Sequence, residues 1–186
     1  DYFFVTPSAM YSYKELEAVE PALFAQRDEH PDVMKGLVIY SSADKCVGCH
    51  AIPRKGADKH VVQCIVNDIA WLGHTRLVLR SDNEPAMLAL IGDALRGLRI
   101  ELSLETVASE GSVPYDPQTN GAAEVAVKLV KASFKANRLT LERRLQTEIP
   151  PNHPALTWLL WHSAILRTIR QVGRDGRTGY ERARGT

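Results

Sequence analysis

The chain has 186 residues, 45% of them hydrophobic and 24% charged, which is enough for one globular domain with a real core. A formal net charge of +1 excludes a strongly acidic or basic protein, and the sequence has no apolar run long enough to span a bilayer, so no membrane partner is expected. Three cysteines, an odd number, argue against a disulfide framework and favour a reducing compartment.

The first half of the chain predicts three strands. Residues 1–5 are aromatic and β-branched, which indicates a strand. Because the sequence starts there without Met, we expect a single domain, 1–186, taken from a longer protein. Residues 6–35 are interpreted as an insertion with a short acidic helix over 13–27. Residues 36–40 and 46–52 flank a polar turn and are expected to form a hairpin beside the first strand.

A helix, a strand and a second helix are predicted next. Apolar spacing predicts a helix over residues 57–72, with Gly73 directly after its end. Residues 76–80 form a short apolar strand, and Glu84-Pro85 opens the second helix, since Pro is well tolerated in a first turn. The buried stripe of that helix is expected at Leu88, Ile91 and Leu95.

The last third predicts one more strand and two helices. Residues 99–104 alternate apolar and polar side chains, which indicates a fifth strand. A loop over 108–120 leads into a helix with Asn120 as N-cap, expected to end near Leu145. A last helix is predicted over 154–171, and a loose tail is expected over 173–186.

This order predicts an α/β fold. Three antiparallel strands followed by two strand–helix crossovers give a mixed five-stranded sheet flanked by helices. The first and fourth strands are expected to be neighbours. Because ligands gather at the carboxyl ends of parallel strands, polar residues at those ends are candidates for a site.

Asp82 and Asp1 are the first such candidates. Asp82 leaves the fourth strand at its carboxyl end, in the segment Arg-Ser-Asp-Asn-Glu. The alternative for Asp82 is an ordinary helix N-cap, a position that Asp favours. Asp1 opens the first strand, and the alternative for it is a solvated strand end.

The long helix after Asn120 offers a third acid. Glu124, Lys128 and Lys131 are spaced i, i+4 and i+7, so one face carries an acid and two bases. The alternative is a surface helix with an ordinary Glu–Lys pair. The opposite face is expected to carry the apolar residues Val125, Leu129 and Ala132.

Two of these segments resemble the catalytic cores of retroviral and retrotransposon integrases. Arg-Ser-Asp-Asn-Glu, residues 80–84, resembles the motif of the second catalytic aspartate. Residues 113–124, Val-Pro-Tyr-Asp-Pro-Gln-Thr-Asn-Gly-Ala-Ala-Glu, are similar to the loop and helix of the catalytic glutamate. The hairpin end at 51–53 and the final Gly-Arg-Thr-Gly-Tyr-Glu extend the resemblance over nearly the whole chain. It implies an RNase H-like fold.

The resemblance also implies a site. Its catalytic and metal-binding residues would be Asp1, Asp82 and Glu124. The cofactor would be Mg²⁺, replaceable by Mn²⁺, since carboxylate oxygens suit hard cations. Two ions about 3.5–4 Å apart would clamp the attacking and leaving oxygens of an in-line displacement. The implied DNA contacts are Tyr115, Asn120, Lys128 and Lys131.

The activity that the resemblance implies is DNA 3′-end processing followed by strand transfer, with water and then a DNA 3′-hydroxyl as nucleophile. Its partners would be element ends, target DNA and further copies of the chain, and it would act in the nucleus and otherwise stay in the cytoplasm. Residues 121–186 carry 12 Lys and Arg against 5 Asp and Glu, a balance of +7 that suits a phosphate backbone. The alternatives are a related transposase or RNase H-type nuclease, and a decayed or domesticated copy that binds nucleic acid without catalysis.

Two further patterns suggest metal or cofactor binding. Cys46-Val47-Gly48-Cys49-His50 matches a haem-attachment pattern. Zinc is also chemically possible, with the ligands Cys46, Cys49, His60 and Cys64. The alternative, which we favour, is a strand whose Cys and His side chains face opposite sides.

The roles of seven further residues remain open. Asp44 could replace Asp1 as third carboxylate, although its place in a hairpin turn puts it at the wrong end of the sheet. Trp158 and Trp161 are expected in the core or at a subunit interface rather than under stacked bases. The arginines of the C-terminal region could meet DNA or form a solvated end; they are Arg167, Arg170, Arg174 and Arg177.

Overall fold

The computed structural model describes residues 2–6, 10–26, 33–111 and 121–185. Its strands are β1 (Tyr2–Val5), β2 (Met10–Ser12), β3 (Met34–Tyr40), β4 (Val47–Ile52), β5 (Arg76–Ser81) and β6 (Thr106–Gly111). Its helices are α1 (Tyr13–Val19), α2 (Pro21–Gln26), α3 (Lys59–Leu72), α4 (Pro85–Glu101), α5 (Gly121–Leu145), α6 (Pro154–Arg170) and α7 (Gly179–Arg184). No helix in these ranges is long and apolar enough to cross a membrane.

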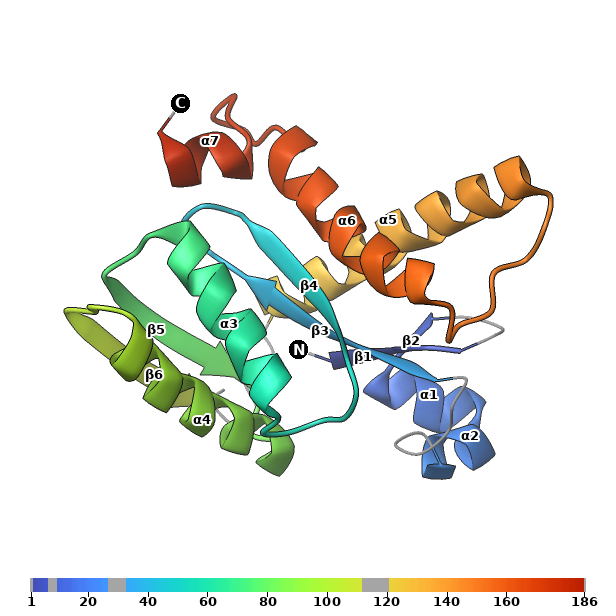
Figure 1. Ribbon diagram of the computed structural model, residues 1–186, viewed down its shortest axis with the longest axis horizontal. Coiled ribbons are helices and arrows are strands. Elements are labelled where there is room, and N and C mark those ends of the chain that lie inside the picture. Colours follow the sequence, from blue (N-terminus) through green and yellow to red (C-terminus); the bar gives the residue numbers. More distant parts are fainter. Residues whose placement is uncertain (1, 7–9, 27–32, 112–120, 186) are drawn as a thin grey trace.

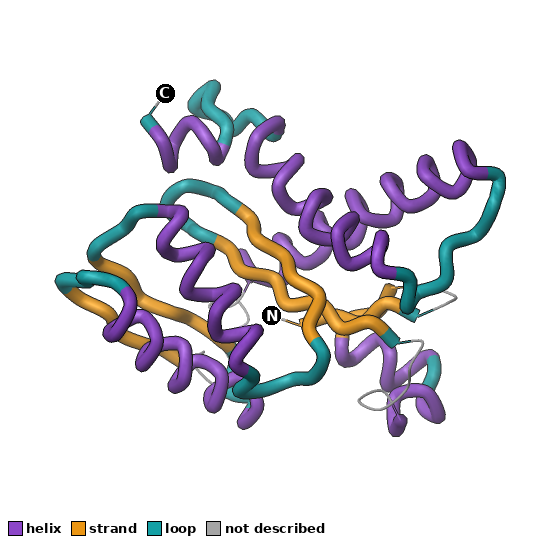
Figure 2. Tube along the Cα trace, viewed as in Figure 1, coloured by secondary structure: helices purple, strands orange, loops and turns teal. Residues whose placement is uncertain are grey.

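The described strands form two sheets (Figures 1 and 2). One sheet is antiparallel throughout, with the strand order β2-β1-β3-β4, and β5 pairs with β6 in parallel. Phe3 lies opposite Gly36 in the β1–β3 register, and a Cβ atom at Gly36 would lie 2.4 Å from the Phe3 ring. Glycine at 36 therefore lets that ring lie against β3. The predicted antiparallel arrangement of β1, β3 and β4 is confirmed.

The expected single five-stranded sheet is not found in the described part of the chain. β1 has β2 and β3 as its neighbours, so the first and fourth predicted strands, β1 and β5, do not pair there. The reason is local. The chain turns back after Val5, and Met10–Ser12 pairs with the open edge of β1 across a short connection, where closing a loop costs little entropy.

α4 is longer than expected and buries a different stripe. It continues to Glu101, so the predicted strand over 99–104 is wrong. The strand that follows is β6, which begins at Thr106 and takes in the start of the predicted loop. Ile100 is 84% exposed at the end of α4. The alternating apolar pattern that begins with Ile100 therefore does not mark a strand. The expected stripe of Leu88, Ile91 and Leu95 is not the most buried one, because Leu88 is 48% exposed, although Ile91 is partly buried and packs against the core. The buried residues are Met87, Leu90, Ala94 and Leu98, which follow helical spacing from the first turn.

Helices cover both faces of the four-stranded sheet (Figure 1). On one face α5 and α6 pack against β1, β3 and β4 and form the first core cluster, which includes Phe3, Val38, Cys49, Val130, Phe134 and Leu160. On the other face α3 and α4 form a second cluster with Tyr2, Leu37 and Ile52, and the β5–β6 pair lies against it. The region read as an insertion packs too, because Leu16 of α1 is buried against Phe4 and Val33.

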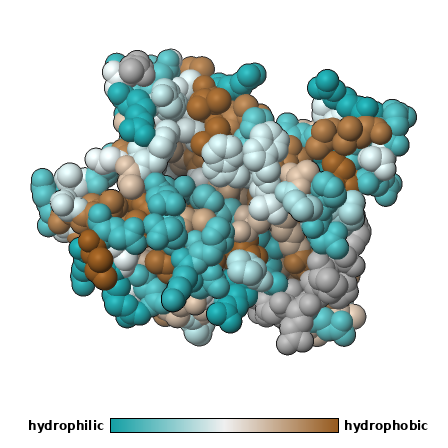
Figure 3. All heavy atoms as spheres, viewed as in Figure 1, coloured by the Kyte–Doolittle hydropathy of each residue, from teal (hydrophilic) through white to brown (hydrophobic). Residues whose placement is uncertain are grey.

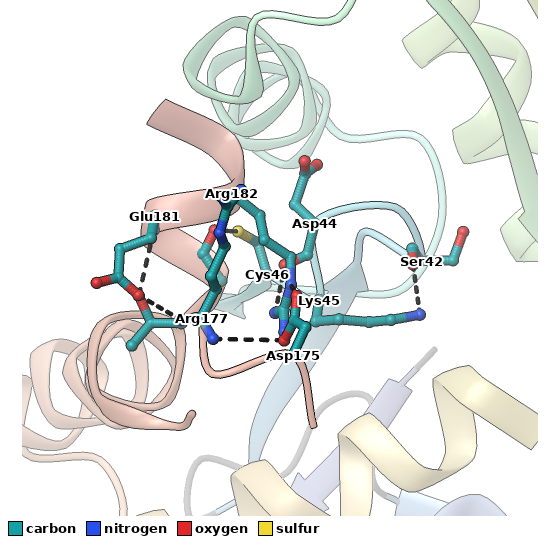
Figure 4. A network of polar contacts seen from close by, with 10 residues as sticks. Ser42, Asp44, Lys45, Cys46, Asp175, Arg177, Glu181 and Arg182 are labelled. Carbon is teal, nitrogen blue, oxygen red and sulfur yellow. Dashed lines mark hydrogen bonds and ion pairs between the residues drawn. The ribbon is translucent and has the colours of Figure 1, made fainter. Parts of the chain in front are cut away.

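The C-terminal segment differs from the expectation of a loose tail. α7 begins with a capping box formed by Thr178 and Glu181, which satisfies two backbone donors of its first turn. The Cys46 thiol donates to the Gly179 carbonyl at 3.2 Å, and Arg182 donates to the Asp44 carbonyl at 3.3 Å (Figure 4). These bonds attach residues 178–184 to the β3–β4 hairpin.

Aromatic contacts fix the outer side of α7. The Tyr180 ring lies 6.1 Å from the Trp71 ring of α3, centroid to centroid. The Arg184 guanidinium lies 4.8 Å from the same Trp71 ring, a cation–π contact. Trp158 and Trp161, by contrast, are exposed on α6, so the expectation of a core position is wrong for both. The subunit interface stays a prediction, with stacked bases as its alternative.

Candidate active site

Asp82 directly follows β5, at the carboxyl end of that strand. The N-cap of α4 is Glu84, with Pro85 as the first helical residue, so the N-cap alternative for Asp82 is wrong. Asp82 Oδ1 is buried and has no hydrogen-bond donor among the described residues. An unpaired buried oxygen costs on the order of 1–3 kcal/mol, so its presence indicates a role such as binding a cation.

Tyr2, the first described residue of β1, lies close to this carboxylate. Its hydroxyl accepts a hydrogen bond of 3.3 Å from the Gly56 N–H, and Gly56 has a φ of +93°, which favours glycine. Burial raises the pKa of the Tyr2 hydroxyl, the Gly56 hydrogen bond lowers it, and the charges of Glu84 and Asp82 raise it. Tyr2 therefore lies within electrostatic range of Asp82, and Asp1, the residue before it, lies outside the described residues.

Lys55 joins the β4–α3 connection to the segment that carries Asp82. Its Nζ atom lies 2.8 and 3.0 Å from the two carboxylate oxygens of Glu84, and its side chain is only 8% exposed. The same ammonium lies 5.0 Å from the Tyr2 ring centroid and 5.5 Å from that of Phe4. This explains why the Glu84 side chain makes no capping bond to α4.

No local pattern in the sequence indicates this contact. Lys55 stands in a short connection after a strand, a position where lysines are usually solvated. Its partner Glu84 is 29 residues away in the sequence, so no local spacing connects them. Only the fold brings Lys55, Glu84 and Tyr2 together beside Asp82.

α5 presents the predicted acid and one predicted base to solvent. Glu124 is exposed in the first turn, and Lys128 is exposed one turn later. The apolar face with Val125, Leu129 and Ala132 is not the one that packs, because Val125 is 53% exposed. The buried residues are Ala126, Val127, Val130 and Phe134. Apolar residues occur on more than one side of this helix, and the side that includes Phe134 is the one that packs.

Lys131 is not a freely exposed base. Its Nζ lies 2.8 Å from Glu15 Oε2 of α1, and its side chain is 17% exposed. The N-terminal segment interpreted as an insertion thus supplies the partner of a predicted DNA contact. The other two predicted DNA contacts, Tyr115 and Asn120, lie outside the described residues.

The described part of the site fits a divalent cation in one respect and is incomplete in another. Mg²⁺ prefers oxygen ligands, and Asp82 offers a buried carboxylate oxygen with no donor of its own in the described ranges. Over those same residues, no three His, Cys, Asp or Glu side chains lie close enough together to hold a metal ion. A complete set with Asp82 therefore needs groups from outside the described ranges.

The positions of the cysteines contradict the zinc and haem hypotheses. Cys49 is fully buried in the core beneath α5 and α6, and burial raises the pKa of its thiol. Cys46 is held against Gly179, and burial, with a smaller effect of Asp44, raises its pKa to about 11. Neither cysteine lies with His60 and Cys64, which are on α3. The favoured alternative is confirmed, because the next residue, His50, faces α3.

Asp44 is excluded as a third carboxylate. Its Oδ2 accepts a hydrogen bond of 2.7 Å from Ser41 Oγ and lies 2.6 Å from His74 Nε2. Both contacts hold it in the turn between β3 and β4, where it contributes to the structure of the hairpin.

A cavity of about 440 Å³ lies along another face of α5. The first turns of α5, the β3–β4 hairpin and the segment before α7 form its walls. Its lining is chiefly apolar, for example Val125 and Leu129, and includes neither Asp82 nor Glu124. It is therefore separate from the carboxylate site.

The fold is similar to solved integrase catalytic cores. The catalytic core domain of BIV integrase matches with a TM-score of 0.55 and 23% identity, over 80% of this chain and 84% of that one. The HTLV-2 integrase catalytic core domain in complex with magnesium matches with a TM-score of 0.57 and 15% identity, over 80% and 84%. A chain of the simian T-cell lymphotropic virus intasome in complex with PP2A regulatory subunit B56 gamma matches with a TM-score of 0.58 and 16% identity.

The intasome match covers 82% of this chain but only 49% of the other, so this chain spans about half of that protein. No protein-family model and no curated protein matches the sequence. At such identities the likeness establishes the fold. The chain has the RNase H-like fold of an integrase catalytic core.

Proposed function

We propose that this chain is the catalytic core of a retrotransposon-type integrase, which trims the 3′ ends of element DNA and joins them to target DNA. One observation carries the proposal: Asp82, at the carboxyl end of β5, has a buried oxygen without a partner in the described ranges, and the surrounding fold is that of integrase cores. That location is where ligands bind in sheets of this kind.

Asp1, Asp82 and Glu124 would hold Mg²⁺, or Mn²⁺ in its place, as a pair of ions. Ions bound there would activate the nucleophile and stabilise the leaving oxygen of the cleaved phosphodiester. Lys55 positions the Asp82 segment through Glu84 and offsets part of the negative charge of this region. Tyr2 contributes a buried hydroxyl that ties the start of β1 to Gly56.

DNA would approach along α5. Lys128 is exposed one turn after Glu124 and would contact a phosphate, which positions the backbone without reading its sequence. A phosphate at Lys131 would take the place of Glu15, which is its partner in the free chain. Tyr115 and Asn120 are proposed as further DNA contacts, and integration would place the protein in the nucleus, with the cytoplasm as its other location.

The core is also proposed to self-associate. The HTLV-2 core was solved in a trimeric form, and the simian T-cell lymphotropic virus protein in an intasome. On this chain α6 exposes Trp158, Trp161 and Ile169. Hydrophobic atoms gather over the C-terminal turns of α6 and the end of α5 (Figure 3). We propose α6 as the contact between copies.

The test is nicking and strand joining of a branched DNA substrate with Mg²⁺ or Mn²⁺. Asp82→Asn and Glu124→Gln should each abolish both reactions, because each removes a metal-binding charge. Asp93→Asn is the matched control, since Asp93 lies on α4 and pairs with Arg96 at the surface. It should retain full activity.

DNA binding without turnover, unchanged by either site variant, would refute the enzyme and leave a nucleic-acid-binding relic. Cleavage confined to RNA–DNA hybrids would favour an RNase H-type nuclease. Joining that requires a different end structure would favour a transposase.

A further inference from the structure

A second cluster of titratable side chains lies between β4 and α3. His50 Nε2 lies 2.8 Å from Asp68 Oδ2. Cys64 Sγ lies 3.7 Å from His60 Nε2. The thiol therefore lies beside the His60 imidazole, and it is near enough to the His50 imidazole, which a carboxylate holds, to affect the pKa of that ring.

The local sequence explains this arrangement. His60, Cys64 and Asp68 are spaced by four residues along α3, so they share one face of the helix. Alternation along β4 directs Cys49 into the core and His50 toward α3. Each member of the cluster therefore occupies its position because of a regular element, without help from a loop.

His50 is held as an imidazolium. Burial lowers the pKa of His50, but its hydrogen bond with Asp68, together with the effects of nearby Cys64 and of the Asp68 charge, outweighs burial and raises that pKa to about 10. A cation next to a cysteine favours the thiolate, which is the reactive form. Cys64 is also partly exposed, whereas Cys46 and Cys49 are buried.

We propose that Cys64 is a reactive thiol, a modification site for peroxides and other small electrophiles that His50 and His60 activate. In the reaction with hydrogen peroxide, the Cys64 thiolate attacks one oxygen and forms an S–O bond while the O–O bond breaks. The leaving hydroxide takes the proton of the His50 imidazolium. Sulfur is oxidised to a sulfenic acid, peroxide is reduced to water, and a thiol reductant restores the cysteine.

The test compares rates of alkylation by iodoacetamide at pH 7, with each cysteine quantified by peptide mass spectrometry. An ordinary thiol is only a few per cent thiolate at this pH, and a stabilised thiolate loses some nucleophilicity. Cys64 in the native 186-residue chain should therefore react about tenfold faster than Cys64 in the urea-unfolded chain. The rate for N-acetylcysteine in the same two buffers corrects this comparison for the effect of urea on the reaction itself. Dimedone after peroxide should label Cys64 first.

Variants separate activation from simple exposure. His50→Gln and Asp68→Asn should each lower the native rate of Cys64 to about the unfolded level, whereas Gln63→Ala should not change it. Gln63 is an exposed neighbour that contacts Asn67 and Glu101. Equal rates in native and unfolded wild-type protein, or native rates unchanged in both His50 and Asp68 variants, would overturn the proposal. If a variant does not fold, the wild-type comparison alone decides.

Discussion

Gly48 of β4 leaves the space that the carboxylate of Asp68 occupies on α3. A Cβ atom at residue 48 would lie 2.2 Å from Asp68 Oδ2, and that same oxygen lies 2.8 Å from His50 Nε2. The glycine in Cys-Val-Gly-Cys-His is therefore needed for contact between a strand and a helix, and the motif needs no metal or haem to explain it.

Gly48→Ala should move Asp68 away and leave His50 without its carboxylate. The loss of a buried charged hydrogen bond and the steric overlap should destabilise the protein by about 1–3 kcal/mol, measured by urea unfolding. Gly92→Ala is the control, because nothing lies within 4 Å of a Cβ there and the helix interior gains from Ala. A Gly48→Ala protein as stable as the control would show that Asp68 has another low-energy position.

The His50–Asp68 pair predicts how stability depends on pH. His50 has a pKa of about 10 in the folded chain, above its ordinary value of 6.5, so the folded state binds its proton more tightly. This contribution is complete below about pH 6.5 and is lost as pH rises through about 10. The melting temperature should therefore fall more between pH 7 and 10 in wild type than in His50→Gln. Parallel curves for the two proteins would contradict the assignment.

Strong local composition made most of the strands predictable. Residues 2–5, 36–40, 47–52 and 76–80 combine β-branched or aromatic side chains with nearby turn signals, and all of them form strands. β2 was missed because Met10–Ser12 has only three residues, and its pairing depends on the free edge of β1, which no local pattern encodes.

Two errors in the helices arise from ambiguous apolar patterns. Ile100, Leu102 and Leu104 alternate like a strand, but Ile100 belongs to the last turn of α4, which its own buried stripe prolongs. In α5, apolar residues fall on two sides, and spacing could not choose between the side of Val125 and that of Phe134. Asp82 and Glu124 were predicted as site residues from linear motifs, and that assignment stays a prediction. Partners from distant segments, such as Glu15 for Lys131, required the fold.

The ion pair between the buried Lys55 side chain and the partly buried Glu84 should contribute more to stability than an exposed pair. Lys55→Met should destabilise the protein by about 1.5–3 kcal/mol in urea unfolding, because it leaves a charged carboxylate without its partner. Glu84→Gln should lower the free energy of unfolding by less, since Lys55 keeps its contacts with two aromatic rings. The variant that carries both substitutions should lose less stability than the two single variants added together.

The control for this pair is Arg80→Met. Arg80 pairs with Glu110 across β5 and β6, and both side chains are more than half exposed. Such pairs contribute about 0–1 kcal/mol. If Lys55→Met and Arg80→Met lowered the free energy of unfolding equally, the buried location of Lys55 would have no energetic significance.

Gly179 should be essential for docking α7. A Cβ atom there would lie 3.1 Å from the Lys45 carbonyl oxygen and 3.2 Å from Cys46 Sγ. Gly179→Val should detach α7, which would speed tryptic cleavage after Arg182 and expose Cys46 to alkylation. Gly92→Val, in open space on α4, should change neither readout. Unchanged proteolysis of Gly179→Val would mean that the Trp71 contacts alone hold α7.

The Asp82 carboxylate should lower the stability of the metal-free protein and raise its stability when a metal ion is bound. Without added metal, Asp82→Asn should raise stability by about 1 kcal/mol, because it removes a buried charge whose Oδ1 has no donor in the described ranges. Mn²⁺ at about ten times its Kd should stabilise wild type by about 1.4 kcal/mol through mass action and leave Asp82→Asn unchanged. Asp93→Asn should respond like wild type. If Mn²⁺ shifts the melting temperature of Asp82→Asn as much as that of wild type, the ion binds elsewhere and Asp82 is not its ligand.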